Sequence, residues 1–343
     1  MIREMKRKFT SYAVIVAMLF VIGSLSSSAQ TFPPNLAYPT SYNTQAFNRS
    51  PSMAVYNGVM YIAYVANNGC SGTSCALYVT GSSNGSTWST PVVWTGAESG
   101  SSPSLVVWNN ELWVAYLADG SDGPLGALYL TYATNPAIGP QHAPIQLTTS
   151  SQYVSSSPTA FVGNNQLAVA VVDNFRSTLT SIDTYVSSNG STFVVGGWCN
   201  NDPTGDMPQV GAVLGVVEFN SNVYYSYQTQ GGAGGHYLRV CQTNFTQTGA
   251  TQSFFSPGYE VGSGVNATVW GANLILSFKD YNSHDLVLEG SKNGQSYSPA
   301  PYSTDLINGN NQMTPGTVSF NGTFYAAFTQ NDGSHYMNVT HSE

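Results

Sequence analysis

An acidic or amide side chain recurs about every fifty residues along this chain of 343 residues. The series consists of Asn67, Asp119, Asp173, Gln230, Asp280 and the pair Asn331-Asp332. Carboxylate and amide oxygens accept hydrogen bonds from sugar hydroxyls, and calcium prefers oxygen ligands of this kind. Asp and Asn also bond their own backbone in loops and so cap turns. The series therefore has two interpretations, a ring of binding groups and a set of turn caps.

Other side chains suited to binding or catalysis lie close to this series. Asp122 and Asp285 would enlarge the same surface, and Phe175 and Tyr281 are aromatic rings that can stack on sugars. The ligand-binding residues that we predict are Arg49, Asn67, Asp119, Asp173, Arg176, Asp280, His284 and Asp332. A glycosidase would need two carboxyl groups, about 5–5.5 Å apart in retaining enzymes and about 6.5–9.5 Å apart in inverting ones. The candidates for such catalysis are Asp119, Asp173, Glu218, Asp280 and Asp332.

An internal repeat indicates the elements that position these residues. Ser50–Asn57 is echoed by Ser102–Asn109, and two further copies span Ser157–Asn164 and Thr314–Asn321. Weaker copies end at Asn220 and Gly271. The six repeats begin near residues 50, 102, 157, 208, 264 and 314. A repeat of this length is typical of propellers and solenoids.

Each repeat alternates apolar and polar residues with a period of two, which predicts strands. The second strands are expected at Val59–Val65, Glu111–Leu117, Gln166–Val172, Asn222–Gln228, Asn273–Lys279 and Thr323–Thr329. Third strands are expected at Ala76–Thr80 and Ala127–Thr131, and a fourth at Ser89–Trp94. Four antiparallel strands per repeat make a propeller blade. The fold class predicted is therefore all-β, a six-bladed β-propeller.

The last repeat stops soon after its third strand, at Tyr336–Thr340. Residues 31–46 can supply the missing strand and close the ring, which would protect sheet edges from pairing with other chains. An open β-solenoid, the alternative, leaves this segment unused. In a propeller, the loops from strand two to three and from strand four to the next blade emerge on one face. The recurring acid and amide residues would gather there, around one mouth.

The first 29 residues have the pattern of a secretory signal peptide. A basic start precedes the apolar stretch Ala13–Leu25, which is too short to span a bilayer, and Ser27-Ser28-Ala29 offers a cleavage site. We expect one domain, residues 30–343, that is extracellular or periplasmic and not inserted in a membrane after cleavage. Export makes disulfides plausible. Cys70 and Cys75 could close one loop, and Cys199 and Cys241 would then join neighbouring repeats.

The charge of the chain argues against nucleic acid as a partner. The whole chain has 9 Lys and Arg and 17 Asp and Glu, and the signal segment carries four of the former and one of the latter. Without it, 5 basic residues remain against 16 acidic ones, since 9 − 4 = 5 and 17 − 1 = 16. Phosphate backbones are bound by clustered Lys and Arg. No cofactor is expected other than calcium.

Three turns between third and fourth strands carry a resemblance to a known family. They are Gly81–Trp88, Val186–Phe193 and Gly290–Tyr297, and the first reads Gly-Ser-Ser-Asn-Gly-Ser-Thr-Trp. This resembles the Asp-box, or BNR repeat, of the sialidase superfamily, Ser-x-Asp-x-Gly-x-Thr-Trp, with Ser83, Ser188 and Lys292 at the aspartate position. The resemblance implies a six-bladed propeller in which these turns brace the hairpins from outside.

The resemblance also implies a catalytic set, which this chain holds only in part. Sialidases bind a substrate carboxylate with three arginines, and Arg49 lies where the first would be. Glu218 and Arg239 are similar to the glutamate that activates the tyrosine nucleophile and to the second arginine. The fifth and sixth blades contain Lys279 and Lys292 but no arginine, and residues 31–97 contain no Asp or Glu for the first-blade acid. Tyr325 or Tyr336 would have to serve as the nucleophile.

The sequence thus favours a secreted, lectin-like propeller that binds a glycan or polysaccharide at its mouth without cleaving it. Two alternatives stay open. One is a sialidase-like glycoside hydrolase, and the other is a surface or adhesion protein in which the propeller contacts other proteins.

Overall fold

The fold is described here from a computed structural model. It describes residues 40–41, 49–66, 70, 74–98, 101–119, 126–148, 154, 156–173, 181–197, 199, 207–209, 211–230, 236–245, 252–283, 285–300, 313–329 and 337–342. The expected signal segment, residues 1–29, lies outside these ranges. Within them, no helix has the length and apolar character needed to cross a membrane.

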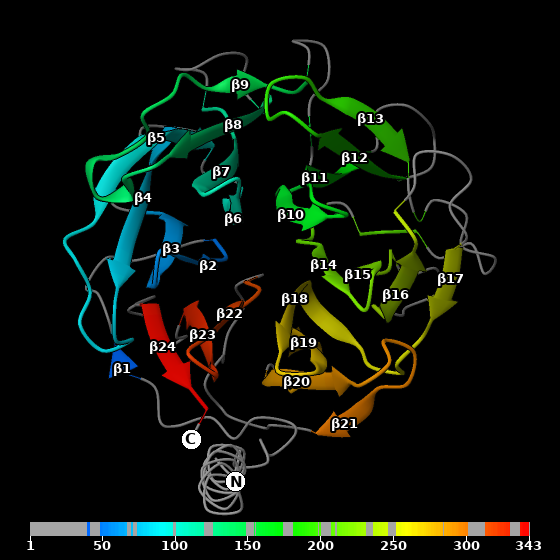
Figure 1. Ribbon diagram of the computed structural model, residues 1–343. Helices are drawn as coiled ribbons and strands as arrows, with labels where there is room; N and C mark the ends of the chain where they lie inside the picture. The colour runs from blue at the N-terminus through cyan, green and yellow to red at the C-terminus, as the bar shows by residue number, and fades with distance from the viewer. Residues whose placement is uncertain are drawn as a thin grey trace, which may run out of the picture.

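Six four-stranded antiparallel sheets surround a central axis (Figure 1), as the repeat predicts. Blade 1 comprises β2 (Ser52–Tyr56), β3 (Val59–Val65), β4 (Ser74–Ser82) and β5 (Val92–Glu98). Blade 2 comprises β6 (Ser104–Trp108), β7 (Glu111–Leu117), β8 (Leu128–Ala133) and β9 (Ile145–Gln146), with the 3₁₀ turn η1 (Pro136–Ile138) before β9. Blade 3 comprises β10 (Thr159–Gly163), β11 (Gln166–Asp173), β12 (Ser181–Ser187) and β13 (Val194–Gly197).

The second half of the ring has the same design. Blade 4 comprises β14 (Gly215–Phe219), β15 (Asn222–Gln228), β16 (Leu238–Thr243) and β17 (Gln252–Phe255). Blade 5 comprises β18 (Val261–Trp270), β19 (Asn273–Asp280), β20 (Leu286–Ser291) and β21 (Ser298–Ala300). Blade 6 comprises β22 (Gly316–Phe320), β23 (Thr323–Thr329), β24 (Met337–His341) and the N-terminal β1 (Thr40–Ser41).

The ring closes as expected. β1 pairs antiparallel with β24, with Thr40 opposite Val339, and becomes the outer strand of blade 6 (Figure 1). The two ends of the described chain therefore share one sheet. The all-β, six-bladed propeller closed by an N-terminal strand is confirmed.

The Asn that follows the inner strand in five of the six blades has a conformational cause; in blade 5 the residue is Gly271. Tyr56 pairs with Val59, so only two residues connect β2 to β3. Both have positive φ, 49° at Asn57 and 71° at Gly58. Two-residue hairpins that match strand twist require positive φ at both positions, which Asn and Gly adopt at low cost. This Asn, here named the anchor Asn, is therefore a hairpin residue on the face opposite the mouth.

The apolar core lies between neighbouring blades. On β7, Leu112, Val114 and Tyr116 pack against blade 1, whereas Trp113 and Leu117 pack against blade 3. Strands whose two faces are both buried read as nearly continuous apolar runs. This is why the second strand of each repeat was the easiest to predict.

The first blade's outer strand differs from the prediction. It runs over Val92–Glu98 and not Ser89–Trp94. Ser89 belongs to the preceding turn, where its backbone N–H donates to the Gly81 carbonyl at 2.8 Å and its carbonyl accepts from the Thr80 hydroxyl at 2.7 Å. Those bonds hold the chain in the turn and delay the start of the strand.

The three turns that resemble the Asp-box share one hydrogen-bond pattern. In blade 3, Asn189 Oδ1 accepts the N–H groups of Ser191 and Thr192 at 3.0 and 2.9 Å, and Ser187 Oγ accepts the Gly190 N–H at 2.9 Å. Equivalent bonds surround Asn84 and Asn293. The side chains that hold the turns are therefore Asn84, Asn189 and Asn293. Each of them directly follows the residue aligned with the aspartate of the motif, Ser83, Ser188 or Lys292.

We expect Asn189→Ala to lower the free energy of unfolding by about 1 kcal/mol, because two turn N–H groups lose their acceptor. Asn189→Asp keeps an acceptor oxygen at the position of Oδ1, so its free energy of unfolding should stay close to that of the parent. Urea denaturation of the two variants measures the difference. An Asp variant as unstable as the Ala variant would show that the side-chain acceptor does not hold the turn.

Both disulfides expected from the sequence are present. Cys70, in the loop after β3, is joined to Cys75 at the start of β4, and Cys199 is joined to Cys241. The second bond connects the end of blade 3 to the third strand of blade 4. The four cysteines of the chain are thereby all paired.

Candidate functional site

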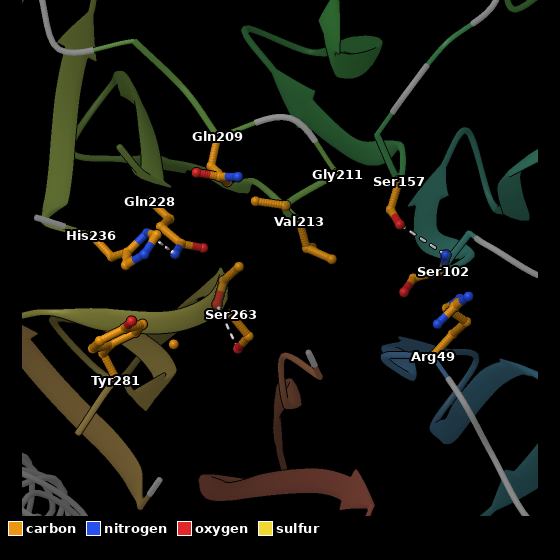
Figure 2. A pocket seen from close by; sticks show the side chains of 13 residues that line it. Arg49, Ser102, Ser157, Gln209, Gly211, Val213, Gln228, His236, Ser263 and Tyr281 are labelled. Carbon is orange, nitrogen blue, oxygen red and sulfur yellow. Dashed lines mark hydrogen bonds between the residues drawn. The ribbon is translucent and has the colours of Figure 1, made fainter. Parts of the chain in front are cut away.

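A cavity of about 170 Å³, here named the mouth pocket, opens where the loops between blades gather around the axis (Figure 2). Its lining comes from blades 1 to 5: Arg49, Ser102, Ser157, Gln209, Gly211, Ala212, Val213, Gln228, His236, Gly262, Ser263, Gly264 and Tyr281. Smaller cavities of about 30 and 80 Å³ continue along the axis between the inner strands. The propeller therefore has a polar opening on the face predicted to carry the site.

The repeated Ser-Pro sequence builds the wall on one side. The N–H of Thr314 donates to Ser50 Oγ at 2.6 Å, that of Ser50 to Ser102 Oγ at 3.0 Å, and that of Ser102 to Ser157 Oγ at 2.9 Å. These bonds join blade 6 to blade 1, blade 1 to blade 2 and blade 2 to blade 3 through the first residue of each repeat. The four copies that keep Ser or Thr at this position belong to blades 6, 1, 2 and 3.

Blades 4 and 5 break this pattern, and the mouth pocket is centred on the break. The equivalent positions are Val213 and Gly264. A Cβ on Gly264 would overlap the backbone of Val213, so glycine lets the two blades approach closely. The N–H of Val265 then bonds the Val213 carbonyl directly at 3.0 Å. Side chains from the loops, Gln209 and His236 among them, replace the serine wall on this side.

An aromatic pair forms the edge of the mouth pocket on blades 4 and 5. The rings of His236 and Tyr281 lie 4.6 Å apart between centroids, at 35°. Gln228 Nε2 lies 3.0 Å from His236 Nδ1. With the amide nitrogen donating, Nδ1 is the acceptor and the ring carries its proton on Nε2, so His236 presents an N–H donor.

Arg49 lies across the mouth pocket from this aromatic pair (Figure 2). Ser263 lies between them, and its hydroxyl donates to the Met313 carbonyl at 3.0 Å. The described lining contains one arginine, one histidine, two glutamines and three serines, and it contains no carboxylate. Its chemistry is that of hydrogen bonding and ring stacking.

Two predicted acids have other partners. Asp280 Oδ1 accepts the N–H groups of Asn282 and Ser283 at 2.9 and 2.7 Å, so Asp280 caps the turn after β19. Asp119 accepts a hydrogen bond from the Ser74 hydroxyl, beside Cys75. Neither lines the mouth pocket. Asp280 thus caps a turn, whereas Asp119 bonds a side chain of the neighbouring blade 1.

Of the other predicted residues, Arg49 and Tyr281 line the mouth pocket, and Gln230 is exposed outside it. Glu218 lies near the opposite face, where its Oε2 accepts the Asn164 N–H at 2.9 Å between hairpins. Asp173 ends β11, and its side chain is outside the described part of the structure. The residues Asn67, Asp122, Phe175, Arg176, His284, Asn331, Asp332 and Tyr336 also lie outside the described residues.

Among the residues that the structure describes, no three His, Cys, Asp or Glu side chains gather where they could hold a metal ion.

The sequence analysis missed Gln209, Gln228, His236 and Ser263. The sequence feature that marks this region is the loss of the Ser-Pro or Thr-Pro pair in the repeats of blades 4 and 5. A binding site that is not sixfold symmetric must depart from the repeat, so the copies that lost Ser-Pro were the ones to examine.

Comparisons with known proteins agree on the fold. No protein-family model matches the chain, and no curated protein matches it either. Solved structures with this fold include the Hadza microbial sialidase Hz136, at 15% identity and a TM-score of 0.62, with 88% of this chain and 68% of that one covered.

Two further solved structures align with most of this chain over most of their own length. An α-L-arabinanase of Penicillium chrysogenum, solved with arabinobiose, has 13% identity and a TM-score of 0.63 over 90% of this chain and 99% of that one. The Aleuria aurantia lectin, solved with α-methyl-L-fucoside, has 14% identity and a TM-score of 0.61 over 88% and 93%. At this identity the likeness shows a sialidase-like propeller fold and not an activity.

Proposed function

We propose that this chain is an extracellular carbohydrate-binding propeller whose site is the mouth pocket. The observation that carries the proposal is the asymmetry of the ring. Where the repeat breaks, the structure brings the half-exposed ring of Tyr281 beside His236, with amide and hydroxyl groups around them. Sugars are recognised by a ring that stacks on their apolar face and by side chains that pair with their hydroxyls.

Three further observations support the proposal. The sialidase, the arabinanase and the lectin described above, proteins named for acting on or binding carbohydrates, share the fold. The two disulfides suit an oxidising compartment outside the cytosol. The acidic balance of the chain, −8 overall, makes nucleic acid and anionic membrane surfaces unsuitable partners.

Binding without cleavage is the function that the described lining favours. Glycosidases place carboxyl groups at the scissile bond. Among the described residues that line the mouth pocket there is neither Asp nor Glu. Incubation with polysaccharides, followed by an assay of released sugars, tests whether the protein cleaves its ligand. Sugar release that depends on the protein would contradict the lectin function and show that the protein is a hydrolase.

We expect Tyr281→Ala to weaken glycan binding by about thirtyfold, equivalent to about 2 kcal/mol, because the stacking surface is lost. Tyr281→Phe should retain most of the affinity. Glycan-array screening of the parent identifies a ligand, and calorimetry then compares the variants. Val194→Ala, at an exposed residue of β13 on the outer edge of blade 3, is the control. Absence of any glycan ligand on the array, or an unchanged affinity in Tyr281→Ala, would contradict the proposal.

A further inference from the structure

A second aromatic surface lies next to the mouth pocket. Tyr237 is 50% exposed and Tyr281 is 44% exposed, and they are the two tyrosines among the large hydrophobic side chains that the described structure leaves exposed. Both lie on the mouth face at the junction of blades 4 and 5. The other exposed large side chains are aliphatic, and they lie on outer strands or in η1: Val93, Ile138, Val194 and Val195.

The backbone places Tyr237 beside a carboxylate. The Leu238 N–H bonds the Tyr259 carbonyl at 2.9 Å, and the Val261 N–H bonds the His236 carbonyl at 2.7 Å. These bonds flank the bridge between Tyr237 and Glu260, which makes the two a non-hydrogen-bonded antiparallel pair. Side chains of such a pair lie closest together on one face. Glu260 is therefore the cross-strand neighbour of Tyr237.

Glu260 also connects this surface to the aromatic edge of the mouth pocket. Its backbone carbonyl accepts the Tyr281 N–H at 3.1 Å, and its Oε2 accepts a hydrogen bond from Asn282 Nδ2 at 2.9 Å. Tyr237, Glu260 and Asn282 therefore form one surface, here named the rim subsite. Two of its residues, Tyr237 and Asn282, directly follow His236 and Tyr281, which line the cavity.

Accepting the carbohydrate site proposed above, we infer that the rim subsite binds a second sugar unit of a neutral oligosaccharide, whose first unit occupies the mouth pocket. The ring of Tyr237 provides a stacking surface. The carboxylate of Glu260 accepts hydrogen bonds from sugar hydroxyls, and the amide of Asn282 can accept hydrogen bonds from them or donate to them. A carboxylate there would repel an anionic unit. The ligand thus extends outward across the junction of blades 4 and 5.

The chain-length dependence of binding tests the inference. Calorimetry with neutral ladders of one to four units, made of arabinose, galactose, glucose, mannose, fucose or xylose, should show about tenfold tighter binding on adding the second unit. Tyr237→Ala should abolish this gain and leave binding of the single sugar unchanged. Tyr237→Phe, which retains the ring, should keep it, and Ile138→Ala is a control at another exposed apolar residue.

The outcomes separate the two proposals. If one unit binds as tightly as two, or if Tyr237→Ala keeps the gain, the rim subsite is wrong and the carbohydrate site at the mouth stands. Preference for uronic-acid ladders over neutral ones would likewise overturn the rim subsite alone. If Tyr281→Ala leaves binding of single sugars intact, the mouth site itself is wrong. Loss of folding in Tyr237→Ala would appear in its circular dichroism. Glu260→Ala then serves as the second variant; it removes the acceptor and should reduce the gain, and an undiminished gain in that variant would overturn the rim subsite.

Discussion

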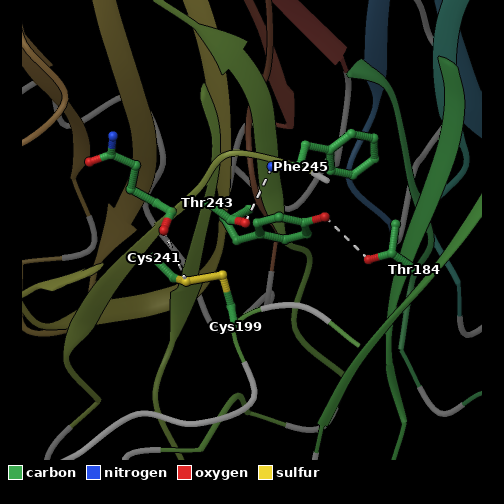
Figure 3. Close-up of a disulfide and its surroundings, with 7 residues drawn as sticks. Thr184, Cys199, Cys241, Thr243 and Phe245 are labelled. Atoms are coloured by element: carbon green, nitrogen blue, oxygen red, sulfur yellow. Dashed lines mark hydrogen bonds between the residues drawn. A yellow bond between two sulfur atoms is a disulfide. The ribbon is translucent and has the colours of Figure 1, made fainter. Parts of the chain in front are cut away.

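Removing the disulfide between Cys199 and Cys241 is expected to lower the free energy of unfolding by about 4 kcal/mol. The bond closes a loop of 42 residues, and a cross-link stabilises the fold by limiting the unfolded chain, more so for longer loops. Both cysteines are buried in the core between blades 3 and 4, in the same apolar cluster as Phe245 (Figure 3). Alanine at both positions avoids burying a new polar group.

The other disulfide is the matched control. Cys70 and Cys75 are separated by only five residues, so Cys70→Ala with Cys75→Ala should cost about 2 kcal/mol on the same reasoning. Equilibrium denaturation in guanidinium of the two double variants and the parent measures the difference. Equal losses, or a larger loss for the short loop, would show that the entropy of the unfolded chain does not determine the effect.

The fold was predictable because its causes are local and repeated. An apolar run between two hairpin signals predicts β7 at Glu111–Leu117, which is where the structure has it. Two-residue turns at the anchor Asn then fix the register of each inner hairpin. The last repeat ends with its third strand, Tyr336–Thr340 in the prediction and Met337–His341 in the structure. Its fourth strand therefore had to come from the N-terminal segment, and β1 is that strand.

The site was less predictable because it depends on departures from the repeat. Asp280 matches the repeated series by its position in the sequence, but its side chain caps the turn after β19 and does not line the mouth pocket. His236 was passed over since a single histidine in a loop has no pattern. Its role depends on Gln228, which orients the ring, and on Tyr281 from the next blade. Such contacts between blades cannot be read from spacing within one blade.

A buried acid between blades 4 and 5 makes the stability of the fold depend on pH. Glu289, on β20, is fully buried, and neither of its carboxyl oxygens has a hydrogen-bond partner. It shares a strand face with Val287, which packs against blade 4. Burial raises the pKa of Glu289 from the ordinary 4.5 to about 8. Burial and the nearby carboxyl group of Glu289 also raise the pKa of Tyr259 and Tyr297.

The direction of the pH effect follows from these two pKa values. Below pH 4.5 the carboxyl group is protonated in both the folded and the unfolded chain, so its ionisation does not affect the free energy of unfolding. Between pH 4.5 and about 8 the unfolded chain releases the proton and the folded chain does not, so the free energy of unfolding falls. A shift from 4.5 to about 8 corresponds to a loss of about 5 kcal/mol once the pH exceeds the upper value.

Glu289→Gln should remove this dependence, because the amide has nearly the same shape and does not ionise. We expect the variant to match the parent at pH 4 and to exceed it by several kcal/mol at pH 8.5, as measured by denaturation at a series of pH values. Other titrating groups contribute equally to both proteins and cancel in the difference. A difference between Glu289→Gln and the parent that does not grow with pH would mean that Glu289 is ionised in the folded protein, with a counterion or water inside the junction of blades 4 and 5.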